Sequence, residues 1–229
     1  MPIQKWVLMN DIESRSIASA PRHRDAELTK ARILDAALDE FGAHGFAGAR
    51  IEEIAARTDT TKRMLFYYYE SKQGLYAAVL ARAYEQVRLN FLNLDLAGLH
   101  PIEAIKQVAD SIFTHYQNHP EFVRLVIVEN LNDAKVLKEI QAKNGFEMPS
   151  VQLLGDALKM GQERGIFRRY VDAIELQILI DSFCFFRVSN HATFDALYGR
   201  NLVDPEKDEV QRLMLQDLVV AYLTFGKVY

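Results

Sequence analysis

The stretch from residue 50 to 75 constrains the fold of this chain most, because it holds two short helical patterns joined by a tight turn. Ile51, Ile54 and Ala55 recur at helical spacing, so one side of the first helix is apolar and faces a core. In the turn that follows, Asp59 can adopt a left-handed backbone conformation. The pattern predicts a helix-turn-helix.

The second of these helices presents an outward face that is both basic and aromatic. It begins near Thr61, where the hydroxyl of Thr60 or Thr61 can cap it. At about 100° per residue, the inward face comprises Thr61, Leu65 and Tyr69. Arg63 and Tyr67 point away, with Lys62 beside them, and such groups can contact phosphates and base edges in a major groove. The alternative is an ordinary exposed face of a helical hairpin.

Residues on both sides of the pair complete a small helical core. Upstream, Gly45 is a natural helix terminator and Phe46 can plug the core. The apolar stripe before them comprises Ile33, Leu34, Ala37, Leu38 and Phe41. Downstream, Ser71 can cap a long helix. Its stripe comprises Leu75, Val79, Ala83 and Val87.

Residues 29 to 80, TKARILDAALDEFGAHGFAGARIEEIAARTDTTKRMLFYYYESKQGLYAAVL, resemble the DNA-binding domain of the TetR family of bacterial transcription regulators in order and spacing. The resemblance implies a recognition helix that comprises, with its start, Thr60, Thr61, Lys62, Arg63, Met64, Phe66, Tyr67 and Tyr68. It also implies that Lys72, at the start of the next helix, and Arg50, at the start of the preceding one, contact the DNA backbone.

Three positions depart from the family pattern. Asp59 stands where the turn usually has Gly, and Ala49 stands where Thr or Ser usually caps the helix that begins at Arg50. Loss of that cap hydroxyl costs about 1 kcal/mol of helix stability. Arg63 stands where Gly or Thr is common, and an arginine can clamp guanine O6 and N7. We therefore expect a different sequence preference at that base pair.

Composition bounds the class of protein. The chain has 229 residues, 49% of them hydrophobic, which suits one compact domain or two small ones. Its single cysteine, Cys184, lies in the apolar run SFCFF and is expected to be buried rather than redox-active. The sequence has no run of 18 apolar residues and no clear signal sequence, so we expect a cytoplasmic protein without a membrane partner.

The net charge of −4 is compatible with DNA binding because of where the acidity lies. Residues 1–95 carry 13 basic and 13 acidic side chains, whereas the remainder carries 14 and 18. This distribution disfavours a basic, sequence-blind DNA binder and suits a regulator with local basic contacts.

Every strong period beyond residue 95 is helical, so we predict an all-α fold. An N-terminal three-helix helix-turn-helix DNA-binding domain precedes a larger helical ligand-binding and dimerisation domain. The expected segments are a flexible N-terminal arm (1–24), the helix-turn-helix domain (25–72), a connecting helix (73–94) and the distal domain (95–229). The distal helices start at Pro101, follow Pro120, span 134–142, 150–164 and 172–190, and run from Glu206 to Phe225.

The helix at 172–190 is apolar on more than one side. Such a helix is either central to its own core or shared with a partner. Together with the helix at 150–164 and the link GQERGIFRRYVD, it resembles the pair with which family members build an intermolecular four-helix bundle. We therefore expect a homodimer.

Embedded polar and aromatic side chains of the distal domain are candidates for a ligand cavity. The candidate set comprises Phe113, Tyr116, Phe122, Glu129, Asn130, Phe183, Phe186 and Arg187. Each of them taken singly also fits a core position or a buried pair. Such a cavity suits a small, partly apolar molecule, either a ring compound or an acid held by Arg187. No metal, cofactor or catalytic spacing is present in the sequence.

The leading hypothesis is a ligand-responsive DNA-binding transcriptional regulator. The resemblance implies a repressor that binds a palindromic double-stranded operator as a dimer and is released by a small molecule. One alternative is a DNA-bound structural or cell-division factor on the same scaffold. The other is an enzyme with an incidental helix-turn-helix, for which the sequence offers no catalytic residues.

Overall fold

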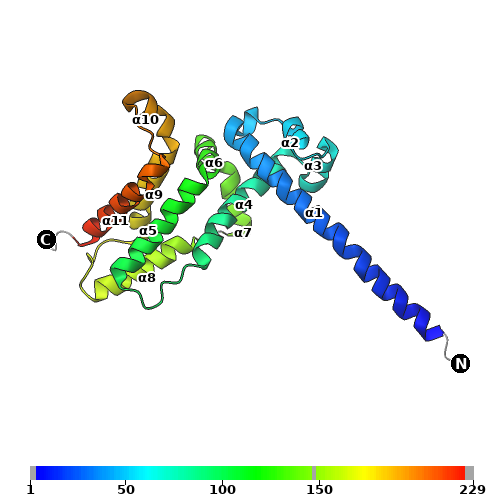
Figure 1. Cartoon of the computed structure of the whole chain (residues 1–229), viewed down its shortest axis with the longest axis horizontal. Helices are drawn as coiled ribbons and strands as arrows, with labels where there is room; N and C mark the ends of the chain where they lie inside the picture. The colour runs from blue at the N-terminus through cyan, green and yellow to red at the C-terminus, as the bar shows by residue number, and fades with distance from the viewer. Residues whose placement is uncertain (1–3, 146–147, 225–229) are drawn as a thin grey trace. The chain divides into compact units, whose positions relative to one another are not determined.

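The computed structural model describes the backbone of residues 4–145 and 148–224, and the side chains of residues 25–143, 145 and 148–224 (Figure 1). Within these ranges the regular structure is entirely helical, which confirms the all-α prediction. The chain divides into two compact units, Met1–Val79 and Leu80–Tyr229, with the boundary inside one continuous helix. The side chains of the predicted arm, residues 1–24, lie outside the described set.

The first unit contains α1 (Gln4–Gly48), α2 (Ile51–Arg57), α3 (Lys62–Tyr69) and the start of α4 (Lys72–Leu92). Gly45 interrupts α1 with φ of 66°, as predicted for a terminator. The ring of Phe46 then turns onto Phe41 and Tyr76, with centroid distances of 6.2 and 5.2 Å. Ser71 caps α4 by accepting a hydrogen bond from the Gly74 N–H at 2.9 Å, as predicted.

The second unit continues α4, and its described residues add seven α-helices and one 3-10 turn. They are α5 (Pro101–Asn118), α6 (Pro120–Leu131), α7 (Lys135–Asn144), α8 (Pro149–Glu163), α9 (Ala173–Ser189), α10 (His191–Tyr198), η1 (Pro205–Lys207) and α11 (Asp208–Thr224). Proline occupies the first turn of α5, α6 and α8, where its missing N–H removes no helical bond. Asp172 and Glu175 form a capping box that starts α9.

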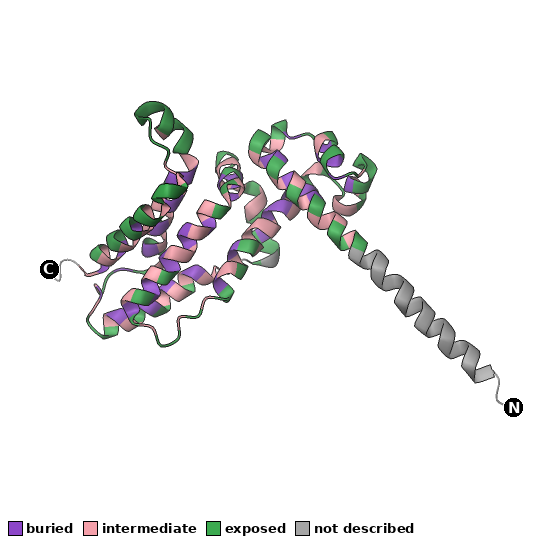
Figure 2. Ribbon diagram, in the orientation of Figure 1, coloured by how far each residue is buried: buried purple, intermediate pink, exposed green. Residues whose placement is uncertain are grey.

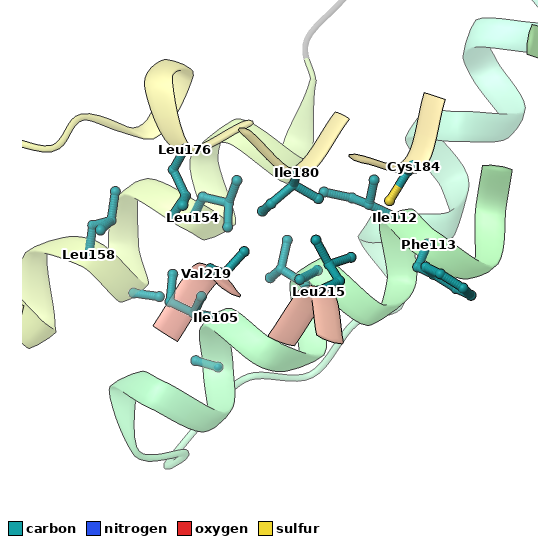
Figure 3. Close-up of a cluster of buried hydrophobic side chains, with 14 of the residues drawn as sticks. Ile105, Ile112, Phe113, Leu154, Leu158, Leu176, Ile180, Cys184, Leu215 and Val219 are labelled. Carbon is teal, nitrogen blue, oxygen red and sulfur yellow. The ribbon is translucent and has the colours of Figure 1, made fainter. Parts of the chain in front are cut away.

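Helix α5 is the centre of this unit. Helices α6, α8, α9 and α11 all pack against it, and most of its length is buried or half-buried (Figure 2). Its exposed positions are Glu103, Gln107 and Asn118. Its apolar side chains meet those of α8, α9 and α11 in one cluster (Figure 3). Cys184 is buried in that cluster, which confirms its reading as a small hydrophobe.

Helix α10 was not predicted from the sequence. None of its residues is buried, so it has no apolar stripe facing a core, and stripes are what periodicity detects. It ends at Gly199, which has φ of 60°. The other distal helices lie close to their predicted ranges, because prolines and caps mark their starts.

We expect Gly161→Ala to destabilise the second unit by about 1–3 kcal/mol, the usual cost of overpacking. A Cβ at Gly161 would lie 2.0 to 2.7 Å from atoms of the Phe167 ring, which is itself buried. Gly155→Ala on the same helix is the matched control, because its Cβ would meet only the Ala173 Cβ at 3.6 Å. The control should be neutral or slightly stabilising in urea denaturation. Equal loss of stability in both variants would contradict the assigned packing.

Candidate nucleic-acid interface and ligand cavity

The turn between α2 and α3 has the local geometry that the sequence predicts. Asp59 adopts φ of 51°, and the Thr61 hydroxyl accepts a hydrogen bond from the Met64 N–H at 3.2 Å. Leu65 is buried, as predicted, and Tyr69 is half-buried. Thr61 was wrongly placed on the inward face: it is exposed, because the N-cap residue has extended backbone and helical spacing does not apply to it.

The outward face of α3 is open to solvent. Tyr67 is 78% exposed, and Arg63 and Met64 are also exposed, so the predicted outward orientation of Arg63 and Tyr67 is confirmed. The Lys62 ammonium lies 2.7 Å from a carboxylate oxygen of Glu52. Both members of this pair are more than half exposed, so the pair is weak and can exchange for phosphate.

The remaining predicted contacts on α3 are partly engaged within the protein. Phe66 and Tyr68 are half-buried, and the Tyr68 ring lies 5.3 Å from that of Tyr67. The Thr60 hydroxyl forms a hydrogen bond with the Thr58 hydroxyl at 2.8 Å. The Lys30 ammonium of α1 lies 5.7 Å from the centroid of the Tyr68 ring, so Tyr68 also contacts another helix of its own unit.

Lys72 and Arg50, the two basic residues that flank the recognition helix, differ in how firmly other groups of the protein hold them. Lys72 donates to the carbonyl oxygens of Ala47 and Ala49 at 3.3 and 2.7 Å, so one of its three N–H donors remains for another acceptor. Arg50 is exposed, and its guanidinium lies 3.5 Å from a Glu53 carboxylate oxygen.

A buried carboxylate replaces the cap that the sequence lacks. Helix α2 starts at Ile51 with Arg50 as its N-cap, so Ala49 lies one position outside the cap that the sequence assigned to it. The Glu40 side chain is 1% exposed and accepts hydrogen bonds from the Arg50 N–H at 2.9 Å and from Arg57 at 3.0 Å. Its signal in the sequence is an acid within the apolar stripe that ends at Phe41.

We expect Glu40→Ala to lower the free energy of unfolding of the first unit by about 2 kcal/mol, because the part-buried Arg50 N–H loses its acceptor and the charge pair with Arg57 is lost. Glu40→Gln should fall between wild type and Glu40→Ala, since its amide oxygen can still accept from Arg50. Glu27→Ala, which removes the exposed ion pair with Lys30, is the matched control and should change little. Chemical denaturation of all three variants tests this order. Wild-type stability in Glu40→Ala would contradict the capping role.

The second unit contains a cavity of about 190 Å³ among α4, α5, α6, α8 and α9. Its walls are largely aromatic, with Tyr84, Phe91, Tyr116 and Phe122 among the lining residues. Its polar lining comprises His115, Ser150, Gln177 and Asp181, together with the two tyrosines. A shallower, mostly apolar hollow beside α7 shares Tyr84 and Met148 with it.

The eight ligand residues expected from the sequence do not share this cavity. Tyr116 and Phe122 line it. Phe183, Phe186 and Arg187 instead line a groove between α9 and α11. Buried Glu129 accepts a hydrogen bond from the Leu137 N–H at 3.1 Å and thereby holds the start of α7. Exposed Asn130 donates to the Val126 carbonyl of its own helix.

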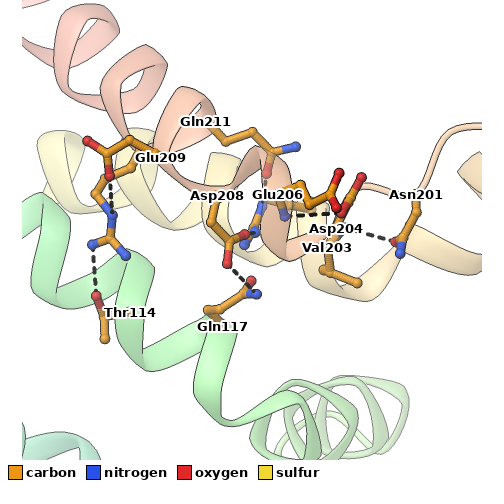
Figure 4. A network of polar contacts seen from close by, with 11 residues as sticks. Thr114, Gln117, Asn201, Val203, Asp204, Glu206, Asp208, Glu209 and Gln211 are labelled. Carbon is orange, nitrogen blue, oxygen red and sulfur yellow. Dashed lines mark hydrogen bonds and ion pairs between the residues drawn. The ribbon is translucent and has the colours of Figure 1, made fainter.

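Phe113 and Arg187 belong to a polar network that ties α5, α9 and α11 together. Arg187 is hydrogen-bonded to Asp208 and Gln211, and Gln117 donates to Asp208 at 2.9 Å (Figure 4). Burial lowers the pKa of the Arg187 guanidinium, and Asp208 opposes that shift.

The ring of Phe113 completes this network as its apolar member. It lies 4.3 Å from the guanidinium carbon of Arg187 and 4.9 Å from that of Arg212. Arg212 in turn pairs with Asp110. It also donates to the Thr114 hydroxyl at 3.0 Å (Figure 4). Both arginines therefore pair with acids of the same subunit, while Arg187 Nη1 is buried without a hydrogen-bond partner among the described residues.

The sequence reasoning missed His115, a central polar group of the cavity. The Asn90 amide lies 2.9 Å from His115 Nδ1, and as the amide donates, the ring proton is assigned to Nε2. Burial, aided by His119, lowers the pKa of His115 to about 4, so the ring is neutral at pH 7. Its Nε2 is buried without a hydrogen-bond partner among the described residues.

Asp181 is the second group that was missed. It accepts hydrogen bonds from Gln177 at 2.9 Å and from the Tyr116 hydroxyl, and burial raises its pKa. Its signal was present, because it is the single acid between Glu175 and the end of an otherwise apolar helix. The helix at 172–190 was characterised by its apolar residues, and Asp181 was not considered as a ligand contact.

No group of histidine, cysteine or acidic side chains in the described part of the chain is arranged to hold a metal ion. No helix there is both long and apolar enough to cross a membrane.

Two parts of the chain match known protein-family models. Residues 33–79 match "Bacterial regulatory proteins, tetR family", and residues 101–219 match "Tetracyclin repressor-like, C-terminal domain". The first match contains the helix-turn-helix, and the second contains most of the helices around the cavity.

Similar whole proteins carry regulator names. The chain is 29% identical over 199 residues to the HTH-type transcriptional repressor NicS of Pseudomonas putida, covering 87% of this chain and 94% of NicS. It is 34% identical over 161 residues to the HTH-type transcriptional repressor SCO4008 of Streptomyces coelicolor, covering 69% and 77%. The crystal structure of the putative transcriptional regulator SCO4942 from Streptomyces coelicolor matches with a TM-score of 0.63 and 27% identity, covering 85% and 98%.

Proposed function

Because this chain belongs to the TetR family of bacterial regulatory proteins, we propose that it is a ligand-responsive transcriptional repressor that binds a palindromic operator as a homodimer. The observation that carries the proposal is α3, whose inner side is fixed by buried Leu65 while Arg63 and Tyr67 face solvent. The names of NicS and SCO4008 support a negative sign of regulation. In this proposal residues 25–72 bind DNA, 73–94 connect, and 95–229 bind ligand and dimerise.

The proposed DNA contacts fall into two kinds. Arg63 and Tyr67 read base edges in the major groove, because both are exposed on the outward side of α3. Lys62 and Arg50 exchange their weak pairs with glutamates for phosphate, and Lys72 offers its remaining N–H. The other proposed contacts are Thr60, Thr61, Met64, Phe66 and Tyr68.

We place the dimer interface on α9 and α11 rather than on α8 and α9. The apolar residues of α8, such as Leu154 and Leu158, are buried in their own subunit, and its outward positions are polar. In contrast, α9 and α11 contact each other and both carry exposed apolar side chains. These are Ile174, Ile178 and Phe186 on α9, and Val210, Leu213, Met214 and Leu218 on α11. An exposed apolar face of this extent suits an isologous dimer.

Ligand control is proposed to pass through α4. This helix begins at Lys72 in the DNA-binding unit and, further along, Tyr84, Val87 and Phe91 line the cavity. A ligand that displaces this part of α4 would favour dimers with the wrong spacing of their two α3 helices. Ligand and operator then weaken each other's binding by the same factor.

Selection from random DNA should yield an inverted repeat with half-sites about one or two helical turns apart. Arg63→Ala should then cost about 1–3 kcal/mol of operator affinity and relax preference at one base pair. Exposed Arg169 in the second unit provides the control Arg169→Ala, which should bind normally. Equal losses on every operator variant would mean that Arg63 contacts phosphate only. A failure to select any sequence would contradict the proposed function.

Ile178→Asp should convert the dimer into folded monomers, because Ile178 is 59% exposed in the subunit and becomes buried only at the proposed interface. Leu218→Asp on α11 should do the same. Gln152→Asp on the outward side of α8 is the matched control and should remain dimeric. Light scattering with circular dichroism measures mass and helicity together. Dimers in both α9 and α11 variants would remove this face from the interface.

A further inference from the structure

We propose that the effector is a small one-ring organic cation that pairs with the Asp181 carboxylate and accepts a hydrogen bond from His115. The inference rests on the proposed function, since it names the ligand class of the cavity through which that function is controlled. The size of the cavity, its aromatic side chains, its unpaired polar atoms and its charge all favour a ligand of this class.

The size of the cavity limits the ligand to about one ring. An apolar cavity of about 150 Å³ can bind benzene, and the present cavity of about 190 Å³ leaves room for one or two small substituents. At its wall the rings of Tyr84 and Tyr116 both contact the ring of Phe122, with centroid distances of 5.4 and 6.2 Å. Aromatic faces suit a flat ligand and also attract a cation.

His115 supplies the donor. Its side chain is 5% exposed, and its Nδ1 is occupied by Asn90. Nε2 is left as a buried N–H without a partner, at a residue that lines the cavity. A buried donor of this kind is costly unless an acceptor reaches it. A ligand with a lone pair on its ring or substituent meets that need.

Helix α9 supplies hydrogen-bond acceptors, so it requires a ligand that donates. Asp181 lines the cavity as an acceptor, and the side-chain oxygen of Gln177 one turn earlier is buried without a partner. Gln177 uses its amide N–H to hold Asp181, which leaves that oxygen for a donor from the ligand. An ammonium or amidinium group carries several N–H donors and can serve both oxygens.

The charge of the cavity selects a cation over an anion. None of its described lining residues is a lysine or an arginine, and His115 is neutral at pH 7. Glu129 adds negative potential near Tyr84: burial first, and then Glu129, raises the pKa of Tyr84 to about 12. Arg187 does not hold an acid here, because it pairs with Asp208 and does not line the cavity. A buried carboxylate gains most from a ligand of opposite charge.

The test uses calorimetry of the full-length protein with four one-ring probes. The para isomer of pyridylmethylamine carries both an ammonium and a pyridine acceptor. Benzylamine lacks the acceptor, para-methylpyridine lacks the cation, and benzoate reverses the charge. We expect pyridylmethylamine to bind tightest, the two single-group probes to bind at least about tenfold more weakly, and benzoate not to bind.

Two variants assign the groups. Asp181→Asn should remove the preference for the cation, so that pyridylmethylamine and methylpyridine bind within about threefold of each other. His115→Phe should weaken the two pyridine probes and leave benzylamine unchanged. Asp156→Asn, an exposed acid on α8 outside the cavity, is the matched control. Circular dichroism establishes that each variant is folded.

Three results would overturn the proposal: benzoate binding as tightly as the amines, an undiminished cation preference in Asp181→Asn, or no binding of any probe up to about 10 mM. Operator binding is measured separately on the selected DNA. If an anionic ring compound releases the protein from the operator, the repressor function is retained and the proposal of a cationic effector is wrong. If no operator is selected, the proposed function fails, while calorimetry still decides the ligand class.

Discussion

The burial of α5 on nearly every side is the constraint on which the second unit depends. A helix in that position can carry polar side chains only where neighbouring helices supply partners. Asp110, Thr114 and Gln117 recur at helical spacing, and all three are met by side chains at the start of α11. The same face holds Phe113 between two guanidinium groups. Fixing α5 thus fixes α11 and, through Arg187, α9.

The polar side chains on another side of α5 need partners in the same way, and this is the side that lines the cavity. His115 and Tyr116 face α4, α6 and α9, where aromatic side chains surround them. Tyr116 finds Asp181 as an acceptor, and His115 finds Asn90 for only one of its two nitrogens. On the face toward α11 the charged groups pair with one another, although Gln117 Oε1 and Arg187 Nη1 are buried without a partner among the described residues. The face toward α4, α6 and α9 keeps the unpaired His115 N–H. The second face combines its unpaired N–H with a cavity, which gives it the capacity to bind a small ligand.

Local chemistry made much of the fold predictable. Asp59, Thr61 and Ser71 act on backbone within three residues of themselves, so their turn and caps could be read from the sequence. The start of α5 at Pro101 is equally local. Glu40 is different, because its partner N–H lies ten residues away on another helix. The apolar stripe of the first helix shows that Glu40 lies at a buried position, but it does not show which group will donate a hydrogen bond to it.

The ligand residues were harder to predict for the same reason. Arg187 and Asp181 are both charged residues on a mostly apolar helix. Arg187 was predicted to contact the ligand, whereas Asp181 was not. Which of them faces a cavity depends on residues of α5 and α11 that are distant in sequence. The dimer face posed a similar problem. The sequence shows that α8, α9 and α11 are apolar, but not that α8 is covered by its own subunit.

The unpaired groups of the cavity also supply a reason for the protein to respond to a ligand. A buried polar group without a partner costs about 1–3 kcal/mol, and His115 and Gln177 each contain such an atom. Coupling free energies between sites in proteins are typically about 1–3 kcal/mol. A ligand that satisfies these atoms in one arrangement of α4 and not in the other therefore gains enough differential free energy to shift the population. A purely apolar ligand of the same size leaves the polar atoms unpaired in both arrangements, so this source of coupling is absent for it.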